Sequence, residues 1–441
     1  MEQKFSRPMV FLIVLLSLIS GCIGGERQVD LEDMAKEHAG YLSSGQYEKF
    51  FNSFDEDMKG EISLEELESL WSEVVETYGE PGDIEDISIE NDGEYTIVDM
   101  TYAFSKGESG VLRIVYDSDC MISGFWISEV SGYELPPYAD QSAYTEVEVE
   151  VVSGDYVLSG ILTMPLGDGP FPGVVLVHGS GANDMDETIG PNKPFKDIAT
   201  GLASQGVAVL RYDKRTYAYS IGINEILGFT VMEETVYDAL AAIETLKAVE
   251  GVDPESIYVI GHSLGGMMAP RIASMTDELA GIVVMSGNAR ALEELIVEQI
   301  WYISNYDGVI DDGEMATIEQ VTEMALRISE LDIGEGEIVL GAARAYWEDL
   351  STYDQVEVAR GLDTPILVVQ GERDYQVTME DFQLWEYGLS GKENATFISY
   401  PGLNHLMMYG EDRSIGTEYY IEGHVDEGLI NDIHEWIGGI A

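Results

Sequence analysis

The chain has 441 residues, a length sufficient for two or three domains. Hydrophobic residues make up 45% of it and it contains 25 tyrosines, a composition that predicts packed globular domains and excludes a disordered acidic chain. The 82 acidic and 22 basic side chains give a formal net charge of −60, and a surface so charged repels nucleic acids and other polyanions. We therefore predict no nucleic-acid partner.

The first residues have the features of a secretory signal. Lys4 and Arg7 precede an apolar run, residues 9–19, that is shorter than the roughly 20 residues of a membrane-spanning helix. The following sequence ISGC resembles a lipoprotein box, in which the cysteine, here Cys22, carries the lipid. We expect a signal peptide over residues 1–21, a tether over 22–29, and an extracytoplasmic protein anchored to membrane lipid through Cys22. An uncleaved N-terminal anchor is the alternative.

Residues 30–132 predict a small α+β domain. Two helical stretches, extending to Tyr78, are followed by strand-like segments at 95–104, 110–116 and 121–130. Helices followed by a run of strands are typical of α+β domains. The segment also resembles a small domain of unknown function, of nuclear-transport-factor-2-like (NTF2-like) shape, that precedes hydrolase domains in some secreted proteins. The resemblance is carried by the stretch FDEDMKGEISLEELESLWSEVVETYG.

The remainder of the chain has a different pattern. Residues 133–142, with paired prolines and polar side chains, predict a linker. From residue 143 to residue 441, buried-type strands alternate with helical segments, which predicts an α/β domain with a mostly parallel sheet covered on both faces. The expected strands are 144–152, 156–164, 173–177, 207–211, 257–260, 281–286, 365–370 and 396–400.

The strongest chemical signal is the sequence GHSLGG, which places Ser263 between the strand-like IYVI and a helical segment. A sharp turn at such a junction exposes the serine hydroxyl, and the glycines two residues to either side remove side chains that would clash. The pattern therefore predicts Ser263 as a nucleophile.

A serine hydroxyl needs a base to remove its proton and a carboxylate to orient that base. Two later strand-like segments end in GERD and PGLNH, which place Asp374 and His405 in the loops that follow. The order Ser, Asp, His is that of α/β-hydrolases. Glu372 remains the alternate acid, because a sequence locates the end of a strand only to within a few residues.

Attack by the serine also requires N–H donors for the charge that develops on the carbonyl oxygen. The sequence VLVHGSG ends a strand-like run and supplies a turn for this purpose. We assign the oxyanion hole to the N–H groups of Ser180 in that turn and of Leu264, the residue after the nucleophile.

From about residue 143 to the end, the chain resembles secreted α/β-hydrolases of the dienelactone hydrolase, serine aminopeptidase and prolyl-oligopeptidase-like assemblage. The motifs HGSG, GHSLGG, GERD and PGLNH stand at the matching places. The resemblance implies an α/β-hydrolase fold with a helical lid inserted over about residues 287–362. The segment LRYDKRTY has Thr216 where the family usually has glycine, and we interpret Asp213 and Arg215 as structural charges.

The expected lid is rich in aromatic residues. These side chains either line an apolar acyl pocket or pack the lid onto the core. They are Trp301, Tyr302, Tyr306, Tyr346 and Trp347.

These observations predict a serine hydrolase that cleaves a carboxylic ester or thioester through a Ser263 acyl-enzyme. A serine peptidase acting on short peptides would use the same residues, because one fold supports both reactions. A binding lipoprotein without activity is a third hypothesis, against which the complete set of catalytic residues argues. The sequence contains no metal-binding cluster, phosphate-binding loop or nicotinamide fingerprint, so we predict no metal and no cofactor.

Overall fold

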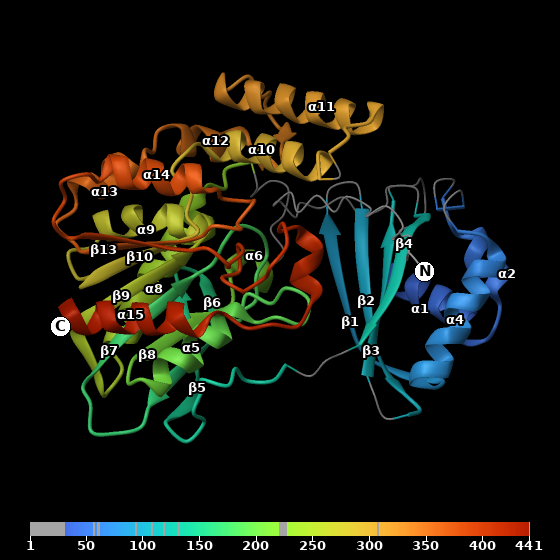
Figure 1. Cartoon of the computed structure of the whole chain (residues 1–441), viewed down its shortest axis with the longest axis horizontal. Coiled ribbons are helices and arrows are strands. Elements are labelled where there is room, and N and C mark those ends of the chain that lie inside the picture. The colour runs from blue at the N-terminus through green and yellow to red at the C-terminus, as the bar shows by residue number, and fades with distance from the viewer. Residues whose placement is uncertain are drawn as a thin grey trace. The chain divides into compact units, whose positions relative to one another are not determined.

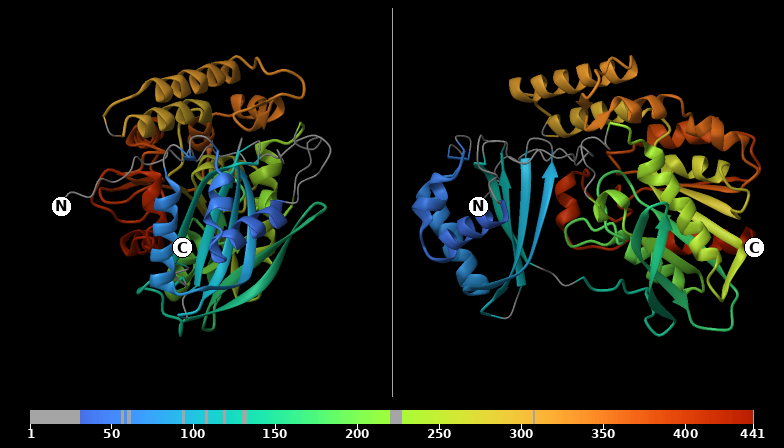
Figure 2. Two further views of the ribbon diagram at one scale, coloured as in Figure 1. Left: turned by 90° about the vertical axis from the view of Figure 1, so that its right-hand side faces the viewer. Right: turned by 180° about the vertical axis from the view of Figure 1, so that it is seen from behind.

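The computed structural model describes residues 31–440 apart from 56–57, 60–61, 93–94, 107–108, 118–119, 130–132, 220–226 and 307. The predicted signal peptide, the tether and Cys22 lie outside the described residues. The chain divides after residue 132 into two compact units, which are treated one at a time below (Figures 1 and 2).

In its described residues, the smaller unit packs three helices against one face of a four-stranded antiparallel sheet, in the order β1-β2-β3-β4 (Figure 1). A capping box between Ser63 and Glu66 begins the third of these helices. The core includes Leu42, Phe50 and Ile114. The elements are α1 (Leu31–Ser43), α2 (Tyr47–Asn52), α4 (Leu64–Tyr78), β1 (Pro81–Asp92), β2 (Tyr95–Phe104), β3 (Ser109–Tyr116) and β4 (Ile122–Glu129).

Strand β1 is absent from the elements that the sequence predicted. Its pairing with β2 shifts register on both sides of Ile84, so a bulge interrupts the alternation of faces there. Ile84 and Ile87 consequently both pack against the core although three positions separate them. A period of two does not relate these residues, and the two carboxylates between them, Glu85 and Asp86, further obscure the strand.

The larger unit contains an eight-stranded sheet in the order β14-β13-β10-β9-β7-β8-β6-β5. Every neighbouring pair is parallel except the two pairs that include β6. The prediction of an α/β fold with a mostly parallel sheet is confirmed. The strands are β5 (Tyr144–Ser153), β6 (Tyr156–Pro165), β7 (Phe171–Val177), β8 (Ala208–Tyr212), β9 (Val252–His262), β10 (Gly281–Met285), β13 (Ile366–Gly371) and β14 (Ala395–Tyr400).

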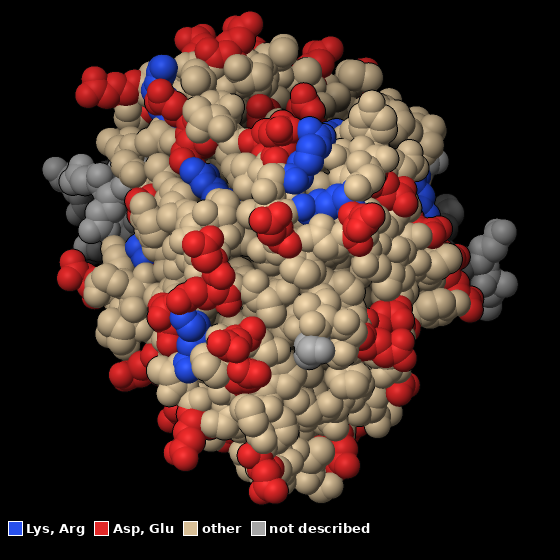
Figure 3. Space-filling model, turned by 90° about the vertical axis from the view of Figure 1, so that its left-hand side faces the viewer, with Lys and Arg blue, Asp and Glu red and all other residues tan. Residues whose placement is uncertain are grey.

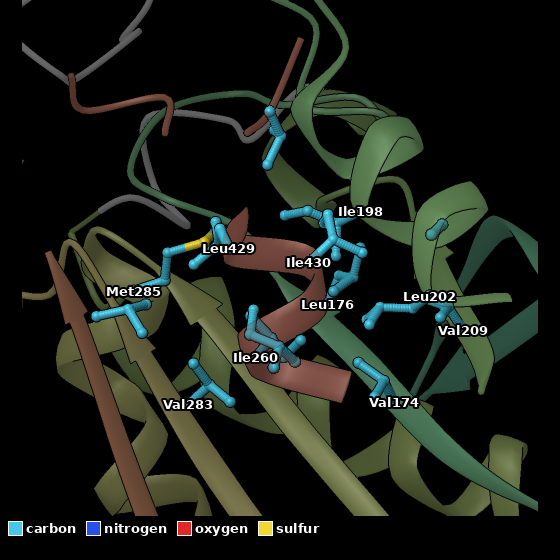
Figure 4. Close-up of a cluster of buried hydrophobic side chains, with 14 of the residues drawn as sticks. Val174, Leu176, Ile198, Leu202, Val209, Ile260, Val283, Met285, Leu429 and Ile430 are labelled. Atoms are coloured by element: carbon cyan, nitrogen blue, oxygen red, sulfur yellow. The ribbon is translucent and has the colours of Figure 1, made fainter. Parts of the chain in front are cut away.

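Helices cover both faces of this sheet (Figures 1 and 2). On one face, Ile198 of the first covering helix and Ile430 of the last pack against Val174, Leu176 and other buried strand residues (Figure 4). Strands buried on both faces have continuous apolar sequences, as these do. The helices of the first face are α5 (Pro194–Ser204) and α15 (Glu427–Ile440), and those of the other are α8 (Tyr237–Lys247), α9 (Leu264–Ser274) and α14 (Met379–Gly388).

The segment predicted as a linker, residues 133–142, packs on the larger unit. The Tyr133 hydroxyl donates to Asp197 of α5 at 2.5 Å, and the Tyr138 hydroxyl donates to the carbonyl of Val425 at 2.7 Å. Two partly buried tyrosines thus hold the segment against α5 and the chain that precedes α15.

A helical insertion separates β10 from β13, where the resemblance implies a lid (Figure 1). Tyr346 and Trp347 are buried in it, whereas Trp301 is 48% exposed. Tyr346 and Trp347 therefore form part of the packing of the insertion and are not exposed to solvent. The elements of the insertion are α10 (Leu292–Ser304), α11 (Asp312–Ser329), β11 (Ile338–Val339), β12 (Ala342–Ala343), α12 (Arg344–Ser351) and α13 (Gln355–Gly361).

The surface carries the charge that the composition implies. On the face drawn in Figure 3, acidic side chains are scattered widely, and the few lysines and arginines lie beside them. Arg290 pairs with two acidic residues, the partly exposed Glu298 and the buried Asp381. Within the part of the chain that the structure describes, no helix is both long enough and apolar enough to cross a membrane.

Candidate active site

The predicted site residues follow different strands of the larger sheet but lie at one edge. Ser180 follows β7, Ser263 follows β9, Asp374 follows β13 and His405 follows β14, and these strands run parallel. The carboxyl ends of parallel strands meet at the same edge of a sheet, where ligands of α/β proteins bind.

The turn at Ser263 has a strained backbone. Its φ of 53° and ψ of −116° lie outside the regions that non-glycine residues favour. Its N–H donates to the carbonyl of Met285 at 2.9 Å, and its side chain remains partly exposed between buried neighbours. A Cβ at Gly261 would lie 2.1 Å from the carbonyl oxygen of Gly265, so only glycine permits this turn.

His405 is held by a buried carboxylate. Its Nδ1 lies 2.7 Å from Oδ2 of Asp374, and both side chains are buried. The other oxygen, Oδ1, accepts from the backbone N–H groups of Gln376 and Val377 at 2.8 and 3.0 Å. A carboxylate so fixed accepts a hydrogen bond from Nδ1–H, which leaves Nε2 as the nitrogen able to take a proton from a neighbour.

In the structure Asp374 contacts His405, whereas Glu372 points to a different partner. Glu372 is exposed, and its Oε1 accepts from the hydroxyl of Ser399 at 2.8 Å. The backbone N–H of Glu372 still belongs to the sheet edge, since it donates to the carbonyl of Tyr400 at 2.9 Å. The geometry therefore favours Asp374 as the acid of the pair.

The turn after β7 lies directly beside the serine. A Cβ at Gly179 would meet the Cβ of Ser263 at 3.2 Å. The N–H of Gly179 is already bound, because it donates to Glu187 at 2.7 Å, so the next N–H along the turn is that of Ser180. Leu264 begins α9, and the first N–H groups of a helix have no partner within it. The N–H groups of Ser180 and Leu264 therefore stay the predicted donors of the oxyanion hole.

A second buried histidine pairs with an acid next to this site. Nδ1 of His262 lies 2.9 Å from Glu187, and its Nε2 lies 2.9 Å from the carbonyl oxygen of His405. A carbonyl only accepts, so Nε2 carries a proton, and Nδ1 donates to the carboxylate. Burial opposes charge on the ring, but attraction to Glu187 and the hydrogen bond outweigh it and raise the pKa of His262 above 6.5.

The sequence did not reveal Glu187. No spacing or motif relates position 187 to position 262, and the pair forms only because the loop after β7 folds back over the turn at Ser263. His262 is 4% exposed and both of its ring nitrogens have partners, which is the environment of a structural residue.

The described residues also bear on metal binding. Among them, no group of three or more His, Cys, Asp or Glu side chains has the arrangement that a metal ion requires.

Comparisons with known proteins agree with this geometry. The model of the "Alpha/beta hydrolase family" matches residues 174–414, which is more than half of the chain. A relative from Thermotoga maritima, named esterase EstD, is 38% identical over 399 residues, which cover 90% of this chain and 93% of the relative. This chain belongs to the alpha/beta hydrolase family.

Other comparisons concern the N-terminal unit and the solved structures. The model of a protein of unknown function, DUF3887, matches residues 35–125 of this hydrolase, so the predicted N-terminal domain of unknown function is confirmed. Est1E from Butyrivibrio proteoclasticus is 18% identical, with a TM-score of 0.43 over 66% of this chain and 98% of that one. An acylaminoacyl peptidase from Pyrococcus horikoshii is 14% identical, with a TM-score of 0.48 over 81% of this chain and 56% of that one.

We predict that Asp374→Asn lowers kcat for ester hydrolysis by about 10⁴-fold, because an amide can hold the imidazole of His405 in the wrong tautomer. Glu372→Gln is the matched control, since it also neutralises one carboxylate in the same loop. Steady-state kinetics of both variants measure the effect. A larger loss in Glu372→Gln would transfer the role of the acid to that residue.

We also predict a change in the pH dependence of stability for Glu187→Gln. Because the pKa of His262 is raised in the folded state, the stabilisation is complete below pH 6.5 and is lost as pH rises through the raised value. The loss of unfolding free energy in the variant should therefore be greatest near pH 6, on the order of 3 kcal/mol, and should shrink towards high pH.

Thermal unfolding followed by circular dichroism across this range tests the prediction. Burial lowers the pKa of His178 to about 4, and losing its attraction to Glu187 would lower that pKa further, so above pH 6 this ring is neutral in both folded proteins and its contribution cancels from the difference. A difference between wild type and variant that does not change with pH would mean that His262 is uncharged.

Proposed function

We propose that this hydrolase cleaves carboxylic esters or thioesters through an acyl-enzyme formed on Ser263. The observation that carries the proposal is the buried Asp374–His405 pair at the sheet edge where the strained turn presents Ser263. The relative from Thermotoga maritima, which bears the name esterase, supports the choice of an ester as substrate.

In the proposed mechanism, His405 Nε2 removes the Ser263 proton as the hydroxyl oxygen attacks the ester carbonyl. Asp374 stabilises the imidazolium that forms, and the N–H groups of Ser180 and Leu264 bind the negative oxygen of the tetrahedral intermediate. The imidazolium then protonates the departing alcohol or thiol, which leaves the acyl-enzyme. Water, deprotonated by His405, attacks the acyl group, and the carboxylic acid and free Ser263 result.

We expect Ser263→Ala to abolish hydrolysis of p-nitrophenyl esters without unfolding the protein, because the hydroxyl is partly exposed and belongs to a turn. A fluorophosphonate probe should label the wild type at Ser263 and leave the variant unlabelled, as peptide mass spectrometry would show. Labelling of another serine, or turnover that persists in the variant, would remove Ser263 from the mechanism.

The same assay separates the alternatives. Aminoacyl p-nitroanilides are tested beside p-nitrophenyl esters of increasing chain length. A higher kcat/KM for the anilides would identify the protein as a peptidase. A wild type that neither turns over any of these substrates nor reacts with the probe is the result expected of a binding protein.

We further propose that the hydrolase is extracytoplasmic and held to the membrane by lipid on Cys22. The sequence before Cys22 supports this proposal, with its basic start, short apolar run and lipoprotein-like box. In a bacterial host, the wild type should incorporate radiolabelled palmitate and sediment with membranes, whereas Cys22→Ala should do neither. A variant that still sediments with membranes would indicate an uncleaved anchor instead.

A further inference from the structure

A buried lysine binds the turn that carries Ser180. Lys214 lies two residues after the end of β8 and is only 2% exposed. Its Nζ donates to the carbonyl oxygen of Gly179 at 2.7 Å, and the side chain of Asn183 donates to the same oxygen at 3.3 Å. The carbonyl of Gly179 is therefore fixed by a charged donor and a neutral one.

This carbonyl belongs to the same peptide group as the N–H of Ser180. A trans peptide is planar, and its C=O and N–H point in opposite directions. Lys214 therefore fixes the direction of the Ser180 N–H by fixing the Gly179 carbonyl. A cation at the oxygen also polarises the amide, and hydrogen bonds that share a polarised group strengthen one another at low dielectric.

Lys214 is linked to the helical insertion through one intermediate residue. Its Nζ pairs with Oε1 of Glu234, which lies in a π-helical turn, Met232–Val236, just before α8. The other oxygen of Glu234 accepts from the hydroxyl of Tyr346 in α12 at 2.7 Å. All three side chains are buried, so a continuous path of hydrogen bonds runs from the insertion to the turn.

A contribution to folding stability does not by itself explain why these polar side chains are buried here. Replacing a buried ion pair by apolar groups of similar volume is often neutral or stabilising, because desolvation offsets the attraction. The position of the path next to a backbone donor of the site gives it a role that apolar side chains could not take.

We propose that Lys214 is a positioning residue that aims and polarises the Gly179–Ser180 peptide, and that Glu234 and Tyr346 make its position depend on the seated insertion. The inference rests on the proposed function, since it concerns the donor that Ser180 offers to the oxyanion. Lys214 would not touch the substrate, but it would determine how strongly the Ser180 N–H, which does, donates its hydrogen bond.

The main test is the double variant Lys214→Met with Glu234→Gln, which removes the charge pair without leaving a lone buried charge. With p-nitrophenyl acetate, kcat should fall by about 10²-fold with KM little changed, as for the loss of an oxyanion donor. Affinity for a trifluoromethyl ketone, which forms an oxyanion adduct on the serine, should fall by the same factor. Lys214→Gln combined with the same Glu234→Gln, which retains a neutral donor at position 214, should recover part of both losses.

The coupling to the insertion has a matched pair of variants. Tyr346→Phe removes the hydroxyl at the end of the path and should lower kcat by about tenfold. Tyr353→Phe removes a hydroxyl from the same segment that donates to the carbonyl of Met267 at 2.9 Å, outside the path, and should leave kcat near the wild-type value.

Several results would overturn the inference. One is a double variant that keeps the wild-type kcat, and another is a loss of kcat without the parallel loss of ketone affinity. Equal effects of Tyr346→Phe and Tyr353→Phe, following melting temperature, would show a structural role only. Failure of the wild type to react with a fluorophosphonate at Ser263 is a different outcome, which removes the proposed function and the inference with it.

Discussion

The close approach of helix α9 to the end of strand β7 is the constraint on which the site depends. A Cβ at Gly265 would lie 2.2 Å from the carbonyl oxygen of Val177, so the helix can start here only because this residue has no side chain. Its start places the N–H of Leu264 beside the turn that contains Ser180. Any larger residue would force the helix from the strand and separate the two N–H groups that we propose as oxyanion donors.

Around this contact, buried ion pairs fix loops that the sheet alone would leave free. Gly179 is bound from both sides, since Glu187 accepts from its N–H and Lys214 donates to its carbonyl. Arg211, in β8, pairs with Asp186 in the same loop. The chain has only 22 lysines and arginines against 82 acidic residues, yet these two cations are buried behind the turn. Most of the acidic excess therefore has no basic partner and must be solvated.

The sequence predicted the parts of the molecule that follow a period or a motif. The central strands of the larger sheet, such as β7, β10 and β13, are recognisable because burial on both faces makes them largely apolar, and Ser263 because only glycines fit around its turn. Strand β1 escaped prediction because a bulge breaks its alternation. Glu187 and Lys214 escaped because long-range pairing of single charged residues leaves no periodic trace in a chain so rich in carboxylates.

The insertion contacts both halves of the site, which gives its aromatic residues a common explanation. Tyr302 of α10 stacks on Tyr375, with ring centroids 5.0 Å apart, next to Asp374. Tyr346 of α12 binds Glu234 and through it Lys214. One contact supports the loop of the acid and the other supports the oxyanion turn. Displacement of the insertion would therefore disturb both the orientation of His405 and the proposed aim of the Ser180 N–H, so its contacts through Tyr302 and Tyr346 support both halves of the proposed site.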